Sequence, residues 1–163
     1  MSLKTLWFIS VLCAAIVAGL TLAHDLEIPG KSALSGAEWL RMQQTFYGGF
    51  AILGGLSEVI GLISSGILAY LLRAHRPAFI LALIATGCFA GTLLIFAVGN
   101  NPLNQQVAQW TPQTLPPNWQ ATRDAWDRFH AASSVFAVIA LVTLLVSIVR
   151  DTTLISTTSA SRK

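Results

Sequence analysis

Three polar side chains stand inside or beside long apolar stretches of this chain: Glu58, His130 and His24. Glu58 is the only charged residue between Thr45 and Leu72, a stretch long enough to cross a bilayer, since about 20 apolar residues cover a hydrocarbon core of roughly 30 Å. A carboxyl group near the bilayer midplane costs roughly 3 kcal/mol to insert, so Glu58 is expected to face protein or water. It is a candidate functional group, and the alternative is a hydrogen bond that only fixes a neighbouring helix.

The helical face that carries Glu58 predicts a pocket. At 100° per residue, Tyr47, Ala51, Gly54 and Glu58 lie close together on one side of a helix. That face combines a phenol near its outer end, two small residues and a buried acid, and Gln43 extends it outward by one turn. The alternative is that the small residues form a close-packing seam between helices.

A second polar face precedes the last apolar stretch. Arg123, Trp126 and His130 recur at spacings of three and four residues, so they share one helical face, which Trp119 joins one turn earlier. An ion pair between Arg123 and Asp127, with the tryptophans at the membrane interface, explains part of this pattern. It does not explain a histidine and an arginine on the face that continues into the membrane.

Metal binding has candidate ligands without a specific signal. His24, Glu27 and His130 match the two-histidine, one-carboxylate set of non-haem iron, and the two histidines alone are candidate haem ligands. The chain has no HxxxH or ExxH motif, and Cys13 and Cys88 lie in apolar stretches without a CxxC motif. We therefore expect no cofactor, and metal or haem stays open as an alternative.

The elements that must position these residues are transmembrane helices. The chain has 163 residues, of which 54% are hydrophobic and 10% charged, whereas soluble domains carry about 25% charged residues. We predict an all-α, antiparallel four-helix bundle in the membrane, formed by residues 1–150 and followed by a disordered tail at 151–163. The four helices are expected at about 6–23, 37–72, 77–98 and 119–149.

Local signals refine the helix ends. Ser35 and Glu38 form a capping box ahead of the second helix, and the sequence Gly99-Asn100-Asn101-Pro102 is expected to stop the third. The first apolar stretch ends in Thr21-Leu22-Ala23, which resembles a signal-peptide cleavage site, but its 18 residues favour a retained helix.

Charge indicates the location and the partners. Lysine and arginine flank the helices on the side that carries both termini, which predicts cytoplasmic termini in a multi-pass protein of a bacterial inner (plasma) membrane. The net charge of +3 comes without a basic stripe interleaved with aromatic residues, so nucleic acid is not an expected partner. The expected partners are membrane lipid and an apolar or phenolic small molecule, and the oligomeric state stays open.

Taken in order along the chain, the motifs resemble the anthrone oxygenase-like family of small four-helix membrane proteins. They are His24-x-x-Glu27-x-Pro29-Gly30-Lys31, then Trp39, Gln43-Gln44, Tyr47 and Glu58, then Asn100-Asn101-Pro102-x-Asn104, and finally Trp119 with Arg123-x-x-Trp126-x-x-x-His130.

The resemblance implies a four-helix membrane fold and, by analogy with characterised members, oxidation of an anthrone to an anthraquinone by dioxygen without an obligatory organic cofactor. Such chemistry needs a base and an apolar pocket. The expected catalytic residues are His130 or His24 as the base, Arg123 and Tyr47 beside an enolate oxygen, and Glu58 as a proton relay. The expected substrate-binding residues are Gln43, Trp119, Trp126, Asn101 and Asn104.

Two other classes of function remain. The chain is a non-catalytic membrane scaffold or lipid- or ligand-binding subunit if its polar faces only fix helix packing, and a redox subunit if it carries haem or metal. A cavity lined by Tyr47, Glu58 and His130 favours the oxygenase, and a dry packed seam favours the scaffold.

Overall fold

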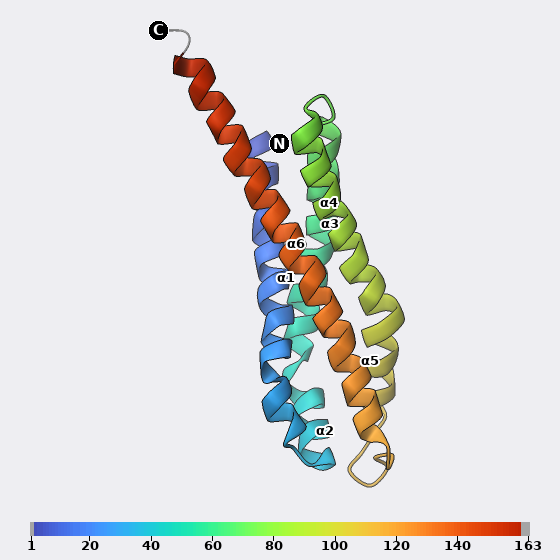
Figure 1. The fold of residues 1–163 in the computed structure, drawn as a ribbon. Helices are drawn as coiled ribbons and strands as arrows, with labels where there is room; N and C mark the ends of the chain where they lie inside the picture. The colour runs from blue at the N-terminus through green and yellow to red at the C-terminus, as the bar shows by residue number, and fades with distance from the viewer. Residues whose placement is uncertain (1, 161–163) are drawn as a thin grey trace.

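Four long helices run antiparallel along one bundle in the computed structural model, which describes the backbone of residues 2–160 and the side chains of residues 2–150 (Figure 1). Helices α1 and α4 each pack against both α3 and α6. The predicted all-α four-helix bundle is therefore confirmed for the described residues. The elements are α1 (Leu3–Ser32), α2 (Gly36–Phe46), α3 (Gly48–Leu71), α4 (Arg76–Ile95), the π-helical turn η1 (Phe96–Asn100), α5 (Asn101–Ala108) and α6 (Trp119–Ala160).

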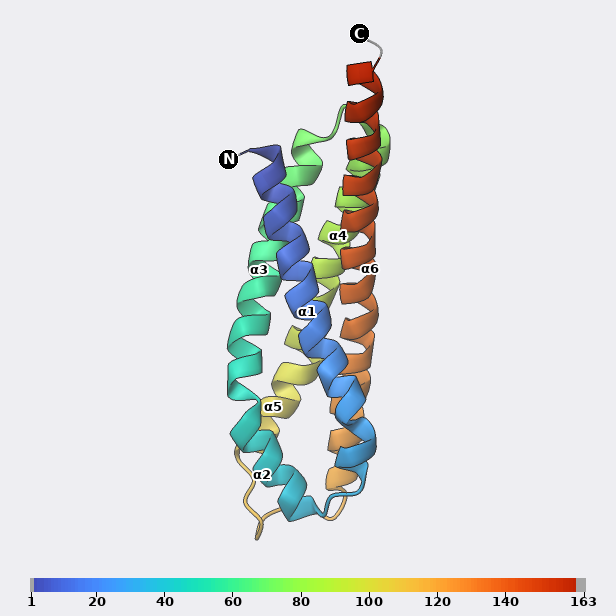
Figure 2. The same cartoon turned by 90° about the vertical axis from the view of Figure 1, so that its left-hand side faces the viewer.

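The bundle has the dimensions and composition of an integral membrane protein. Four segments are long and apolar enough to cross a bilayer: Leu3–Ser32, Gly48–Leu71, Arg76–Ala108 and Trp119–Arg150. Large apolar side chains cover the outside as well as the inside, including Phe8 and Ile52. The N-terminal end of α1 and the C-terminal end of α6 lie at one end of the bundle, and α2 and α5 lie at the other (Figures 1 and 2). Which end is cytoplasmic stays a prediction.

Small residues let the helices approach closely in the half of the bundle near the termini. Gly61 of α3 faces the ring of Phe89 of α4, which is fully buried, and a Cβ atom at position 61 would overlap that ring. Hydroxyl groups add polar contacts between helices, for example from Ser10 Oγ to Ser64 Oγ at 2.8 Å. This half therefore has the close-packed seam that small residues favour in membrane helices.

The predicted single helix at 37–72 is wrong, because it is broken at Tyr47. Tyr47 ends α2 with φ −92° and ψ 0°, and α3 begins at Gly48. Gly48 and Gly49 carry no side chain to pack across the break, and glycine is a poor helix former, so the bend falls at this pair. The bend directs the short, more polar α2 across the end of the bundle (Figure 2).

The predicted stop at Gly99–Pro102 is also wrong. Helix α4 continues through η1 into α5, and Pro102 lies in the first turn of α5, directly after the π-helical turn. The side chain of Asn100 is buried, and its Nδ2 donates to the carbonyl oxygen of Trp126. The side-chain amide of Asn100 is therefore satisfied by α6, and the asparagine does not need a turn of the backbone to provide its hydrogen-bond partner.

Two other helices extend further than predicted. Helix α1 does not end near residue 23 but continues to Ser32, where His24 and Lys31 are buried against the rest of the bundle. Helix α6 continues to Ala160 through most of the tail that was expected to be disordered, and residues 161–163 lie outside the described residues. Extending an existing helix adds one hydrogen bond per residue without a new nucleation step, so polar residues can follow a long apolar helix.

We expect Gly61→Ala to destabilise the protein by about 1–3 kcal/mol, because the added methyl group would force Phe89 out of its packed position. The matched control is Gly87→Ala on α4, where a Cβ atom meets nothing within 4 Å in the described structure. That change should be neutral or slightly stabilising, because alanine is the better helix former. Thermal unfolding in detergent measures both, and equal stability of the two variants would contradict the packing argument.

Candidate functional site

A pocket of about 860 Å³ lies between α1, α3 and α6 and the continuous segment from α4 to α5. The face predicted from helical periodicity lines it: Tyr47, Ala51, Gly54 and Glu58. Most of the wall is apolar, and its polar groups are few. Besides Tyr47 and Glu58, the polar and aromatic lining includes His24, Gln43, Asn104, Trp126 and His130.

Imidazole and aromatic rings gather around His24 of α1, at the end of the pocket that is near α2 and away from the chain termini. The centroids of the His24 and His130 rings lie 4.4 Å apart, and Trp126 lies 4.0 Å from His130 and 5.0 Å from His24. Tyr47 meets the edge of the His24 ring at 4.7 Å, and Phe50 lies 5.0 Å from it. The two predicted bases, from helices more than 100 residues apart in sequence, are thus in direct ring contact.

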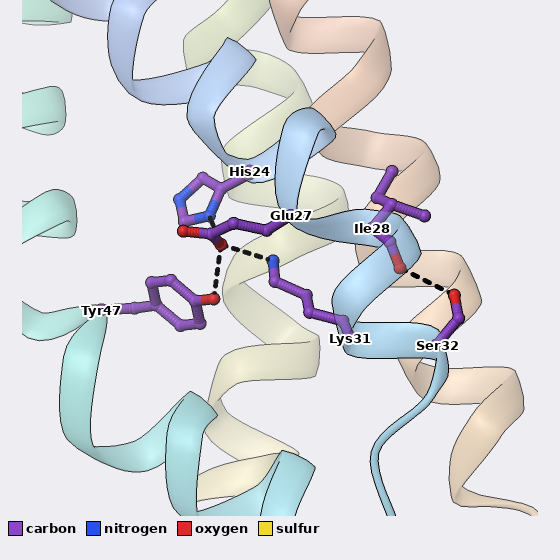
Figure 3. Close-up of polar contacts among 6 residues, drawn as sticks. All are labelled: His24, Glu27, Ile28, Lys31, Ser32 and Tyr47. Atoms are coloured by element: carbon purple, nitrogen blue, oxygen red, sulfur yellow. Dashed lines mark hydrogen bonds and ion pairs between the residues drawn. The ribbon is translucent and has the colours of Figure 1, made fainter.

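The carboxylate of Glu27 anchors this ring cluster (Figure 3). Its Oε2 atom accepts a hydrogen bond from Tyr47 Oη at 2.7 Å and lies 3.1 Å from Lys31 Nζ and 3.7 Å from His24 Nδ1. Lys31 is almost completely buried, and its Nζ also lies 4.9 Å and 4.7 Å from the ring centroids of Tyr47 and Trp126. Ion pairing and cation–π contacts together compensate for burying this ammonium group.

Tyr47 keeps its proton in this environment. Burial raises the pKa of its phenol well above the ordinary value, and the hydrogen bond to the Glu27 carboxylate raises it further. A phenol has one proton to donate, and here it is donated to Glu27. Tyr47 therefore presents its ring to the pocket, and in this structure it has no second proton for the enolate oxygen of a substrate.

Trp126 connects the ring cluster to the opposite wall of the pocket. Its Nε1 donates to Asn104 Oδ1 of α5 at 2.8 Å, and its carbonyl oxygen accepts from Asn100 Nδ2 at 3.1 Å. These two bonds hold α6 against the segment from η1 to α5. Asn104 was predicted to line the site and does, whereas Asn101 does not, because its neighbour Asn100 is the asparagine that points into the bundle.

A protein-family model described as anthrone oxygenase matches residues 42–143, which is more than half of the chain. The protein belongs to the anthrone oxygenase family. The matched range contains most of the pocket wall, including Glu58, Trp126 and His130, whereas His24 and the anchor at Glu27 precede it. Comparison with curated proteins and with solved structures gives no match.

Two residues predicted from helical spacing and residue type, Arg123 and Trp119, lie away from the pocket. Arg123 binds Asp124 Oδ1 through Nε and Nη2, both at 2.9 Å, and its guanidinium group lies over the ring of Trp119. Trp119 in turn packs 5.3 Å from Trp39 in a separate apolar cluster under α2. Both residues sit at the start of α6, beyond the pocket end, so sharing a helical face with His130 did not bring them to the site. The alternative ion pair with Asp127 is not formed either.

The candidate metal ligands do not form a metal site. Among the described residues, no group of three or more histidine, cysteine, aspartate or glutamate side chains is arranged to hold a metal ion. His24 and His130 lie ring against ring, and the nearest partners of Glu27 are Tyr47 and Lys31.

Lys31 and Asn100 are the residues that sequence reasoning missed. A signal for Lys31 was present: His24, Glu27 and Lys31 follow one another at spacings of three and four, which places all three on one face of α1. Because the first helix was expected to end at about residue 23, the three residues were not assigned to a helical face. Asn100 had no comparable signal, because only the tertiary contact with Trp126 distinguishes it from Asn101.

We expect Tyr47→Phe to lower the free energy of unfolding by about 1 kcal/mol, because it removes the hydrogen bond that joins the α2–α3 break to α1. Combined with Glu27→Gln in a double-mutant cycle, the two changes should cost less than the sum of their separate effects.

The matched control is Tyr70→Phe, at an exposed tyrosine near the other end of α3, which should change stability little. Unfolding in mixed detergent micelles is measured for the wild type and for all four variants. Strict additivity of Tyr47→Phe and Glu27→Gln would show that the bond does not stabilise the fold.

Proposed function

We propose that the protein is a dioxygen-using oxidoreductase that oxidises an apolar phenolic substrate of the anthrone type in this pocket. The supporting observation is the pocket itself, whose apolar walls end in the neighbouring imidazoles of His24 and His130. Its volume lies within the range of small-molecule sites, roughly 300–1,000 Å³. Family membership supports the same class of reaction.

The chemistry requires a base, an apolar cavity and dioxygen. Removal of a proton from the CH₂ group of an anthrone gives a carbanion that is conjugated with the carbonyl group and delivers electrons to dioxygen. Oxygen bonds to that carbon, and the resulting hydroperoxide loses water to leave a second carbonyl group. One oxygen atom of O₂ ends in the quinone and the other in water, with both hydrogens of the CH₂ group, so the step balances without another reductant.

We assign the base to His130. Both His130 and His24 line the pocket with a buried Nδ1 that has no hydrogen-bond partner in the described part of the chain, but only His130 lies within the range that the family model matches. A histidine within reach of the substrate contributes about 10²–10⁴-fold as a general base. His24 contacts it ring to ring, and the Glu27 carboxylate near His24 Nδ1 helps to orient that second imidazole.

Two amides take the role beside an enolate oxygen that residue type and position had suggested for Arg123. Gln43 and Asn104 line the pocket, Gln43 is buried, and both carry N–H donors suited to an enolate oxygen. The ring of Trp126 offers a flat surface for a planar substrate beside them. Glu58 lies about eleven residues further along the helix than Tyr47, roughly 16 Å, and is placed to exchange a proton at the other end of the pocket.

A ligand-binding subunit without turnover would use the same pocket, whereas a packed scaffold would not need one. Oxygen uptake with anthrone in proteoliposomes, corrected for spontaneous oxidation, distinguishes an oxidase from a ligand-binding subunit. We expect protein-dependent uptake that His130→Ala lowers by about 10²–10⁴-fold. The matched control is His75→Ala, at the exposed histidine before α4, which should retain full activity. Wild-type uptake at the background rate, with anthrone still bound, would identify a binding protein and overturn the oxidase proposal.

A further inference from the structure

On one side of the pocket, the neighbouring helices do not pack closely against each other. Helix α3 packs along α1 and α4, whereas η1 packs on α4, α5 and α6. Within the described residues, neither η1 nor α5 makes extensive contact with α3 beside the pocket. The pocket wall is therefore open between α3 and the segment from η1 to α5.

Both ends of this opening are closed. At the end near α2, Gln44 Nε2 donates to the carbonyl oxygens of Val107 at 2.9 Å and Trp110 at 3.0 Å, which connects α2 to the end of α5. Toward the other end, α3 meets α4 where Gly61 packs against Phe89. The opening thus faces sideways from the bundle rather than along its axis.

The rim of the opening is apolar and lies within membrane-spanning segments. Leu56 and Val59 of α3 and Phe96 of η1 line the pocket, yet remain 58%, 46% and 37% exposed. Gly55 and Ala108 complete this rim. The residues belong to the spans Gly48–Leu71 and Arg76–Ala108, so the surface they share is one that hydrocarbon, not water, would cover.

We propose that the pocket opens laterally into the hydrocarbon core of the bilayer between α3 and the segment from η1 to α5, and that its ligand is a lipid-dissolved molecule that enters through this opening. The identity of the ligand as an oxidisable substrate rests on the function proposed above, but the opening does not. Dioxygen dissolves better in hydrocarbon than in water, so the same opening would supply both reactants.

The first test asks what fills the opening. A spin label is attached at Gly55→Cys in a Cys13→Ala/Cys88→Ala background in phosphatidylcholine liposomes, and its collisions with oxygen and with a water-soluble nickel chelate are compared. Gly87→Cys, on the outer face of α4, is the lipid-facing reference, and Gln113→Cys, in the exposed loop after α5, is the water-facing one. A Cβ atom at either glycine meets nothing within 4 Å, so both variants should fold.

We expect the label at Gly55→Cys to resemble the one at Gly87→Cys, with frequent oxygen collisions and few chelate collisions. Chelate collisions as frequent as at Gln113→Cys would show that the opening is filled with water and would overturn the proposal.

The second test blocks the opening with Gly55→Phe and uses Gly87→Phe as the matched control. Liposomes loaded with anthraquinone are mixed with protein liposomes, and its binding is followed by quenching of tryptophan fluorescence, since Trp126 lines the pocket. We expect binding to Gly55→Phe to be about tenfold slower than to Gly87→Phe.

Equal rates would overturn the proposed access route. This readout needs no turnover, so the two proposals fail separately: slow binding to Gly55→Phe without oxygen uptake by the wild type removes only the oxidase function. Oxygen uptake by the wild type with equal binding rates removes only the lateral route.

Discussion

The arrangement of side chains at the α2 end of the bundle depends on the carboxylate of Glu27. This carboxylate joins α1 to the break between α2 and α3 through Tyr47, and it pairs with the buried ammonium group of Lys31, although the Glu27 side chain itself remains 41% exposed. An ammonium group buried without such a partner would be strongly destabilising. The pair therefore lets α1 continue two turns beyond its apolar stretch and brings His24 against His130.

The pocket exists because two helices depart from regular geometry beside it. The break at Tyr47 turns α2 across the end of the bundle, and the π-helical turn η1 displaces the end of α4 before α5 begins. Single π-helical turns are rare and often accompany functional sites. Nearer the termini, where α3 and α4 are regular, Gly61 and Phe89 pack closely. Among the described helices, the break and the π-helical turn thus both lie in the half that holds the pocket.

The polar groups of the pocket are divided between its two ends. The imidazoles, the amides and the indole of Trp126 gather at the end near α2, and Glu58 lies further in. The planar apolar substrate proposed above would place its polar edge at that end and its apolar body in the middle of the pocket. Arg123 lies outside this arrangement and pairs with its neighbour Asp124 at the start of α6.

The sequence by itself determined the number of helices long and apolar enough to span a membrane, and the helical face from Tyr47 to Glu58 that lines the pocket. These follow from apolar length and helical period, which are properties of one segment at a time. Only the tertiary structure decided that Lys31 and Asn100 are buried in the bundle and that Arg123, Trp119 and Asn101 lie away from the pocket. Periodicity relates residues along one helix, but the rotation of that helix against its neighbours, and the points where it bends, depend on contacts between segments far apart in sequence.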